Sequence, residues 1–173
     1  MGTKGFFLFS QRASEIDVAG RLARLVNLTT PNMLLHGEER RSDTRANRSL
    51  PVLLAPWEND EPVVEETTVA ITKDLGGTGV SVLLRQPLRM GALVLGFWMP
   101  DEPGNPVDGS PLFVRAHVVT NTPLGGGFWQ CGLEVDEILL ETDYPQLEKL
   151  APRMQQMAPP RRALDADDNL PEI

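Results

Sequence analysis

Short segments rich in β-branched residues follow one another from residue 50 onward, and they restrict the possible folds more than any other feature. Between them lie clusters of Gly, Pro, Asn and Asp, the residues that favour turns. We expect strands at residues 50–55, 63–72, 79–85, 93–99, 112–120 and 128–135. This spacing is typical of an antiparallel barrel or sandwich, so the chain is predicted to be mainly β.

Apolar and other residues alternate within these segments, as expected for strands with one face in a core. In the third segment, one face carries Val80, Val82 and Leu84, and the other carries Ser81, Leu83 and Arg85. In the last segment, the core face would carry Trp129, Cys131, Leu133 and Val135. We therefore interpret Cys131 as a small core residue, because free cysteine is usually buried.

Helices are expected on both sides of the strands. Before them, Ser14 is a suitable N-cap for an amphipathic helix that runs to about Asn27. Its apolar positions are Ile16, Ala19, Leu22, Ala23 and Val26. Residues 6–9 are apolar and fit either a short strand or an arm.

After the strands, a short helix is predicted, with Asp143 as its cap and Pro145 in its first turn. Pro152 should shorten or kink this helix. That helix would carry Leu147, Leu150 and Met154 on one side, and residues 158–173 are expected to be disordered.

Several classes of protein are disfavoured by the composition. The chain has 173 residues, which fits one domain, and its one cysteine cannot form an internal disulfide. His36 and His117 are far apart in the sequence, so no metal site is expected. No signal peptide or membrane-spanning run is present, and we expect a cytoplasmic protein. No catalytic motif is recognisable, because no serine has the setting of a nucleophile elbow and the tail acids lack EF-hand spacing. We expect a protein that is not an enzyme and needs no cofactor.

An arginine stretch precedes the first strand, in a chain whose formal net charge is -8. Four of the sixteen Lys and Arg residues fall within nine positions: Arg40, Arg41, Arg45 and Arg48. One interpretation is a solvated charged face, neutralised by Glu38, Glu39 and Asp43 nearby. The other is an anion site, because the planar guanidinium group binds phosphate or a guanine edge through two parallel hydrogen bonds.

A glycine-rich motif lies between the second and third strand segments, at residues 74–79. Three of its last four residues are glycines, namely Gly76, Gly77 and Gly79. A tight hairpin turn would use them, and so would a site where a ligand approaches the main chain closely. A second glycine run at residues 125–127 is interpreted as a loop, because no helix pattern follows it.

Together, Arg41-x-x-x-Arg45 and Asp74-x-Gly76-x-x-Gly79 resemble the two signatures of the PilZ domain, Arg-x-x-x-Arg and Asp/Asn-x-Ser-x-x-Gly. Residues 130–135 are also similar to the closing strand of that family, so the resemblance covers about residues 38–141. It implies a six-stranded antiparallel β-barrel, flanked by the N-terminal helix and the short C-terminal helix. The implied organisation is an extension at 1–37, the barrel at 38–141, a helix at 142–157 and a tail at 158–173.

The resemblance also implies a function, the binding of the bacterial second messenger cyclic di-GMP. The implied ligand-binding residues are Arg40, Arg41, Arg45, Asp74, Gly76 and Gly79. Gly76 stands where the family has serine, which removes a hydroxyl. The signal would pass to a protein partner through residues 1–37, and no nucleic-acid polymer would be bound. The alternative is a PilZ-like interaction module that no longer binds nucleotide.

Overall fold

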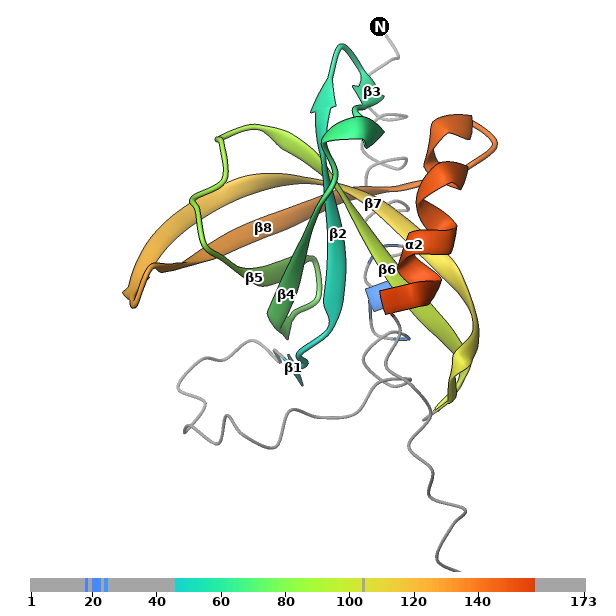
Figure 1. Ribbon diagram of the computed structural model, residues 1–173, viewed down its shortest axis with the longest axis horizontal. Helices are drawn as coiled ribbons and strands as arrows, with labels where there is room; N and C mark the ends of the chain where they lie inside the picture. The colour runs from blue at the N-terminus through green and yellow to red at the C-terminus, as the bar shows by residue number, and fades with distance from the viewer. Residues whose placement is uncertain (1–17, 19, 23, 25–45, 104, 158–173) are drawn as a thin grey trace, which may run out of the picture.

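The computed structural model describes Val18, residues 20–22, Arg24, residues 46–103 and residues 105–157 (Figure 1). Eight strands, all paired antiparallel, form one sheet in this part of the chain. They are β1 (Ala46–Asn47), β2 (Pro51–Glu58), β3 (Glu61–Pro62), β4 (Thr68–Leu75), β5 (Gly79–Leu84), β6 (Ala92–Glu102), β7 (Asn105–Gly125) and β8 (Phe128–Leu139). The prediction of a mainly β protein is confirmed.

The number of strands differs from the six expected. Each expected strand overlaps one of the longer strands, while β1 and β3 are additional and have two residues each. The β2–β3 turn consists of Asn59 and Asp60, both with positive φ, which suits a two-residue hairpin. Residues 63–72 were expected to be one strand, but Val64–Glu66 forms the 3-10 helix η1 and β4 begins only at Thr68. The expectation of a strand at this place was wrong, because Val63 and Val64 are β-branched but the strand preference of a residue depends on its context.

The longer strands are neighbours in the order β4, β5, β8, β7, β6, β2. Because β2 pairs with β4 as well as with β6, these six strands form a closed cycle of hydrogen-bonded neighbours. β1 adds to the cycle beside β4, and β3 adds to it beside β2. In Figure 1, β4, β5 and β8 lie to one side of β2, and the C-terminal helix lies to the other.

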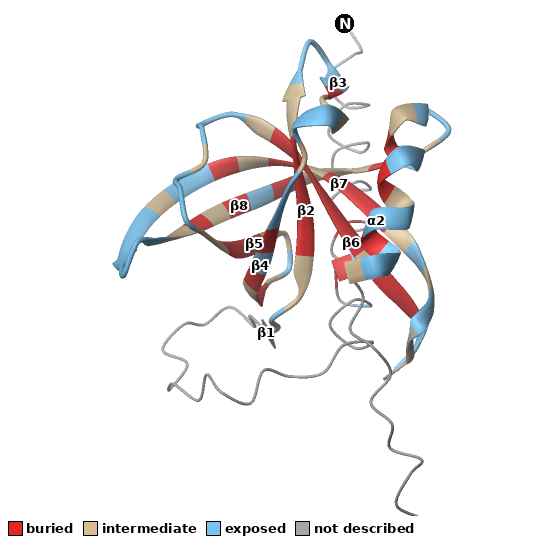
Figure 2. Ribbon diagram, viewed as in Figure 1, coloured by how far each residue is buried: buried red, intermediate tan, exposed pale blue. Residues whose placement is uncertain are grey.

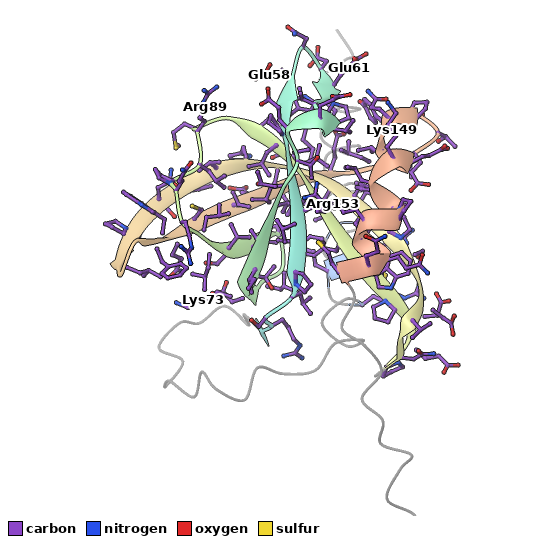
Figure 3. All side chains as sticks on the ribbon, in the orientation of Figure 1. Glu58, Glu61, Lys73, Arg89, Lys149 and Arg153 are labelled. Carbon is purple, nitrogen blue, oxygen red and sulfur yellow. The ribbon has the colours of Figure 1, made fainter. Side chains whose placement is uncertain are left out.

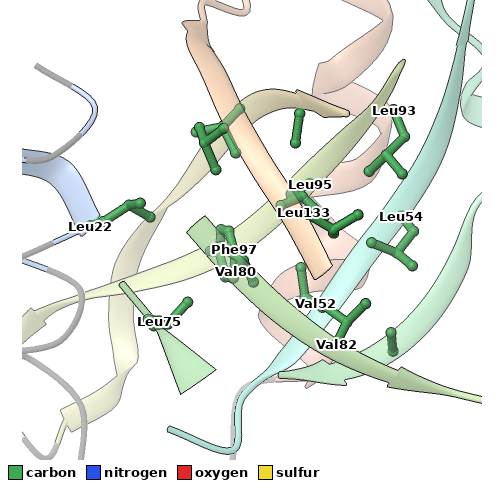
Figure 4. Packing of buried hydrophobic residues seen from close by; sticks show 14 of the residues in the cluster. Leu22, Val52, Leu54, Leu75, Val80, Val82, Leu93, Leu95, Phe97 and Leu133 are labelled. Carbon is green, nitrogen blue, oxygen red and sulfur yellow. The ribbon is translucent and has the colours of Figure 1, made fainter. Parts of the chain in front are cut away.

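The larger apolar cluster lies on the face of the strands that the cycle encloses (Figures 2 and 4). Its members include Val52, Leu54, Val80, Val82, Leu95, Phe97, Cys131 and Leu133. Val18 and Leu22 belong to the same cluster, and both are helical. Leu22 therefore faces the core as predicted, and Val18 joins it one turn earlier. Burial raises the pKa of the Cys131 thiol, which disfavours the reactive thiolate and fits a core residue.

A second apolar cluster lies on the opposite face of β2, β6 and β7, beneath the C-terminal helix. This helix consists of η2 (Pro145–Leu150) and α2 (Ala151–Met157), and it buries the predicted residues Leu147, Leu150 and Met154. Asp143 is not its cap: Tyr144 precedes η2, and no side chain caps it. None of the helices among the described residues has the length and apolar character needed to cross a bilayer.

Close packing between α2 and β6 depends on Gly96. A Cβ atom at this position would lie 3.2 Å from Met154 Sδ and 3.2 Å from Phe113 Cε1. The missing side chain therefore lets Met154 lie directly on the sheet.

We predict that Met154→Ala lowers the free energy of unfolding by about 2–5 kcal/mol, because it leaves a cavity at a fully buried site. Gln155→Ala, one position away and exposed, should change it by less than about 0.5 kcal/mol. Urea unfolding of both variants measures the difference. Equal stabilities would show that α2 is not part of the cooperative core.

Candidate functional site

The predicted glycine motif forms the turn between β4 and β5. Asp74 lies near the end of β4, Gly79 begins β5, and the Gly76 N–H donates a hydrogen bond to the Gly79 carbonyl at 2.8 Å. The turn interpretation of this motif is therefore confirmed. Positive φ occurs at Gly91 and at residues 125–127 among the described glycines, and Gly76 is not one of them. Its backbone conformation thus does not itself require glycine.

Arg40, Arg41 and Arg45 lie outside the described residues, but the segment that follows them is fixed. β1 begins at Ala46, directly after Arg45 in the sequence. Ala46 pairs with Leu75, and Asn47 pairs with Asp74. The residues that directly follow Arg45 in the sequence and the start of the glycine motif are therefore neighbours at one end of β4.

Thr72 attaches the next residues of this segment to β4. Its buried hydroxyl donates to the Arg48 carbonyl at 2.5 Å and accepts from the Leu50 N–H at 2.9 Å. The Thr72 N–H also donates to the Leu50 carbonyl at 2.8 Å. One side chain thus makes two hydrogen bonds, to residues two apart, so the chain enters the sheet in a fixed position.

A bulge between Thr72 and Asp74 determines the direction of the Asp74 side chain. Thr72 pairs with Val82, whereas Asp74 pairs with Ser81, so two steps along β4 match one step along β5. Without the extra residue Lys73, Asp74 would share the inner face with Thr72, because side chains alternate along a strand. The bulge places Asp74 on the outer face, opposite Ser81.

A polar row crosses four strands on this outer face. It consists of Asp74, Ser81, Gly132 and Thr120, which are register partners on β4, β5, β8 and β7. Neighbouring strands are about 4.8 Å apart, so the row spans roughly 14 Å. Gly132 has no side chain, and Thr120 Oγ1 lies 2.5 Å from where its Cβ would be. The row therefore presents a carboxylate and two hydroxyl groups around a glycine.

Different chemistry flanks the polar row on its two sides. Toward the β4–β5 turn, Gly79 pairs with Glu134, and Glu134 pairs with His117. His117 Nδ1 lies 2.9 Å from Asp136 Oδ1, and its Nε2 lies 3.8 Å from Glu134 Oε2. On the other side, Lys73 Nζ donates to Gln130 Oε1 at 3.0 Å (Lys73 is labelled in Figure 3).

The electrostatics of the row favour a ligand that brings N–H donors. Asp74 is 9% exposed, and Glu134 adds a second carboxylate on the same outer face, two strands away on β8. A phosphate-bearing ligand would need cations to balance these groups, and the arginine stretch precedes β1 at this place. Among the described residues, no group of three or more His, Cys, Asp or Glu side chains is arranged to hold a metal ion.

Ser81 is the row residue whose own hydrogen bonding is incomplete. It is 2% exposed, and its Oγ has no hydrogen-bond partner among the described residues. A buried polar group left unpaired costs about 1–3 kcal/mol. The sequence placed Ser81 on the outer face but gave no sign that it belongs to the site. Ser81, Thr120 and Glu134 were missed because only strand register brings them onto the same face as Asp74.

We predict that Thr72→Val lowers the free energy of unfolding by about 1–3 kcal/mol, because the Leu50 N–H loses its buried acceptor. Thr72→Ser keeps the hydroxyl and should recover most of the loss. Urea unfolding of the two variants is the measurement. If Thr72→Val were as stable as Thr72→Ser, the hydroxyl would not hold the entering chain.

The likeness that the comparisons with known proteins give is to solved structures. None of the protein-family models matches the chain, and no curated protein is significantly similar to it. A similar solved structure is that of the Bacillus subtilis inhibitor of motility MotI/DgrA, with a TM-score of 0.43 and 21% sequence identity. The match covers 73% of this chain and 56% of that chain, so this chain spans little more than half of that protein's length.

Proposed function

We propose that this chain is a PilZ-like receptor for cyclic di-GMP, in which the closed cycle of six strands is the barrel. One observation carries the proposal: β1 pairs with the end of β4, so Asn47 lies beside Asp74. The residues that directly follow the first signature in the sequence thus pair with the strand end that carries Asp74 of the second. A dinucleotide on the outer face at this place would have both motifs within reach.

The residues suit the chemical groups of this ligand. Arg40, Arg41 and Arg45 would bind the phosphates and the O6 and N7 acceptors of guanine, which an arginine fork matches. Asp74 would accept hydrogen bonds from guanine N–H groups, and Gly79 would leave room beside it. The cations would offset the carboxylates of Asp74 and Glu134, which otherwise disfavour an anion.

The receptor acts without catalysis and passes its signal to a protein partner in the cytoplasm. Val18 and Leu22, which precede the arginine stretch in the sequence, pack in the strand cluster, and β1, which follows Arg45, pairs with β4. Ordering that stretch around a ligand would act on the helix through the chain itself. Residues 1–37 are therefore the proposed output surface.

The interaction-module alternative is favoured by a different observation. Val69 and Ile71 on the outer face of β4 are 45% and 49% exposed, next to the polar row. Exposed apolar side chains gathered on one strand are typical of protein-binding surfaces. Under this alternative, neither cyclic dinucleotide tested below would bind.

We predict that Arg41→Ala and Arg45→Ala each weaken cyclic di-GMP binding at least about tenfold, the loss of one good charge-assisted contact. Isothermal titration at one fixed salt concentration is the measurement, because salt screens charge interactions. Arg89→Ala removes the same charge from the exposed loop between β5 and β6 and should bind as the wild type does.

A comparison with cyclic di-AMP distinguishes a site that recognises guanine from a site that binds anions in general. It carries the same phosphates, but adenine presents an N6 donor where guanine presents the O6 acceptor. The guanine ligand should bind at least about tenfold more tightly, within the range of one bidentate base contact. Equal affinities would reduce the arginine stretch to an anion patch, and unchanged binding by both arginine variants would overturn the proposed site.

A further inference from the structure

We infer that Ser81 is a specificity residue that reads the N2 amino group of guanine together with Asp74. This inference rests on the proposed function and goes beyond it, because Ser81 lies outside both sequence signatures. Ser81 would supply a hydroxyl group to the site, whereas Gly76 lacks the hydroxyl of the serine that the PilZ signature has at that position. The argument depends on the position of Ser81, on its hydrogen bonding and on the shape of the groups around it.

The position of Ser81 beside Asp74 follows from strand register. The two residues are direct partners across β4 and β5, and both side chains point to the outer face. Side chains of direct partners have Cβ atoms about 4.5–5.5 Å apart, so a single planar group can contact both. A hydroxyl and a carboxylate thus lie within reach of the same ligand edge.

The hydroxyl of Ser81 has no structural task among the described residues. Its Oγ is buried and makes no hydrogen bond to any of them. Its neighbours on β5, Val80 and Val82, fill the core on the other face, so alanine would serve the packing of the strand equally well. Native proteins rarely keep a buried polar atom unpaired, and a functional role is one explanation for such an atom.

The groups around Ser81 on the side away from Asp74 are small. Its other register partner is Gly132, which presents no side chain. Thr120 lies beyond it, with its hydroxyl turned toward Gly132. On this side of Ser81, a ligand edge would therefore meet a glycine and a hydroxyl group rather than a large side chain.

Guanine supplies donors in the arrangement that these acceptors require. Its N1–H and one N2–H point the same way and match the two oxygens of a carboxylate, while the second N2–H is left over. We assign N1–H and the first N2–H to Asp74, and the second N2–H to Ser81 Oγ. A guanidinium group from the arginine stretch offers a similar planar set of N–H donors, so the experiment has to separate these two sources.

The test compares Ser81→Ala with the wild type for two ligands, cyclic di-GMP and cyclic di-IMP, in which hypoxanthine lacks the N2 amino group. Ser81→Ala should weaken cyclic di-GMP binding about tenfold, which is ~1.4 kcal/mol, and should leave cyclic di-IMP binding unchanged. The ligand-free variant should unfold at the same temperature as the wild type or higher, since an unpaired buried hydroxyl is removed. Ser110→Ala, on an exposed part of β7, is the matched control.

Each other result overturns the inference in a distinguishable way. Equal weakening for both ligands would assign the Ser81 hydrogen bond to an arginine rather than to guanine. Unchanged affinity for cyclic di-GMP would show that Ser81 is outside the site, while the receptor function stands. Failure of the wild type to bind cyclic di-GMP would overturn the receptor function together with this inference.

Discussion

The bulge in β4 is the constraint on which the candidate site depends. One extra residue, Lys73, separates two polar side chains that would otherwise face the same way. Thr72 points inward and holds residues 48–50 by two hydrogen bonds, while Asp74 points outward into the polar row. A single local irregularity thus fixes the entry of the chain and creates the acceptor surface beside it. Bulges commonly re-aim side chains next to functional sites.

Two apolar clusters hold this arrangement from opposite faces of the same strands. The enclosed cluster fixes the inner faces of β4, β5 and β8, so their outer residues keep their register. The C-terminal helix covers β2, β6 and β7 on the outside and makes its contacts away from β4 and β5. The C-terminal helix therefore completes the second apolar cluster without contacting the polar row.

The sequence predicted much of the fold because alternation and turn residues are local signals. It identified the six longer strands, the core position of Cys131 and the buried residues Leu147, Leu150 and Met154. It placed Asp74 and Gly79 at a turn but did not predict the bulge, because a bulge breaks the alternation on which such predictions rest. Ser81 and Thr120 join Asp74 only through strand register, which the sequence does not specify. The interpretation of Arg40, Arg41 and Arg45 as ligand-binding residues stays a prediction, because they lie outside the described residues.

The central claim is that cyclic di-GMP binds along the polar row on the outer face of β4, β5 and β8. Backbone amide spectra of the ¹⁵N-labelled protein, recorded during titration with cyclic di-GMP, test it most directly. The account predicts that the amides of Asp74, Gly79, Ser81 and Gly132 shift, while that of Gly109, on the β6–β7 hairpin, stays in place. Shifts confined to the β6–β7 hairpin, or no shifts at saturating ligand, would contradict it.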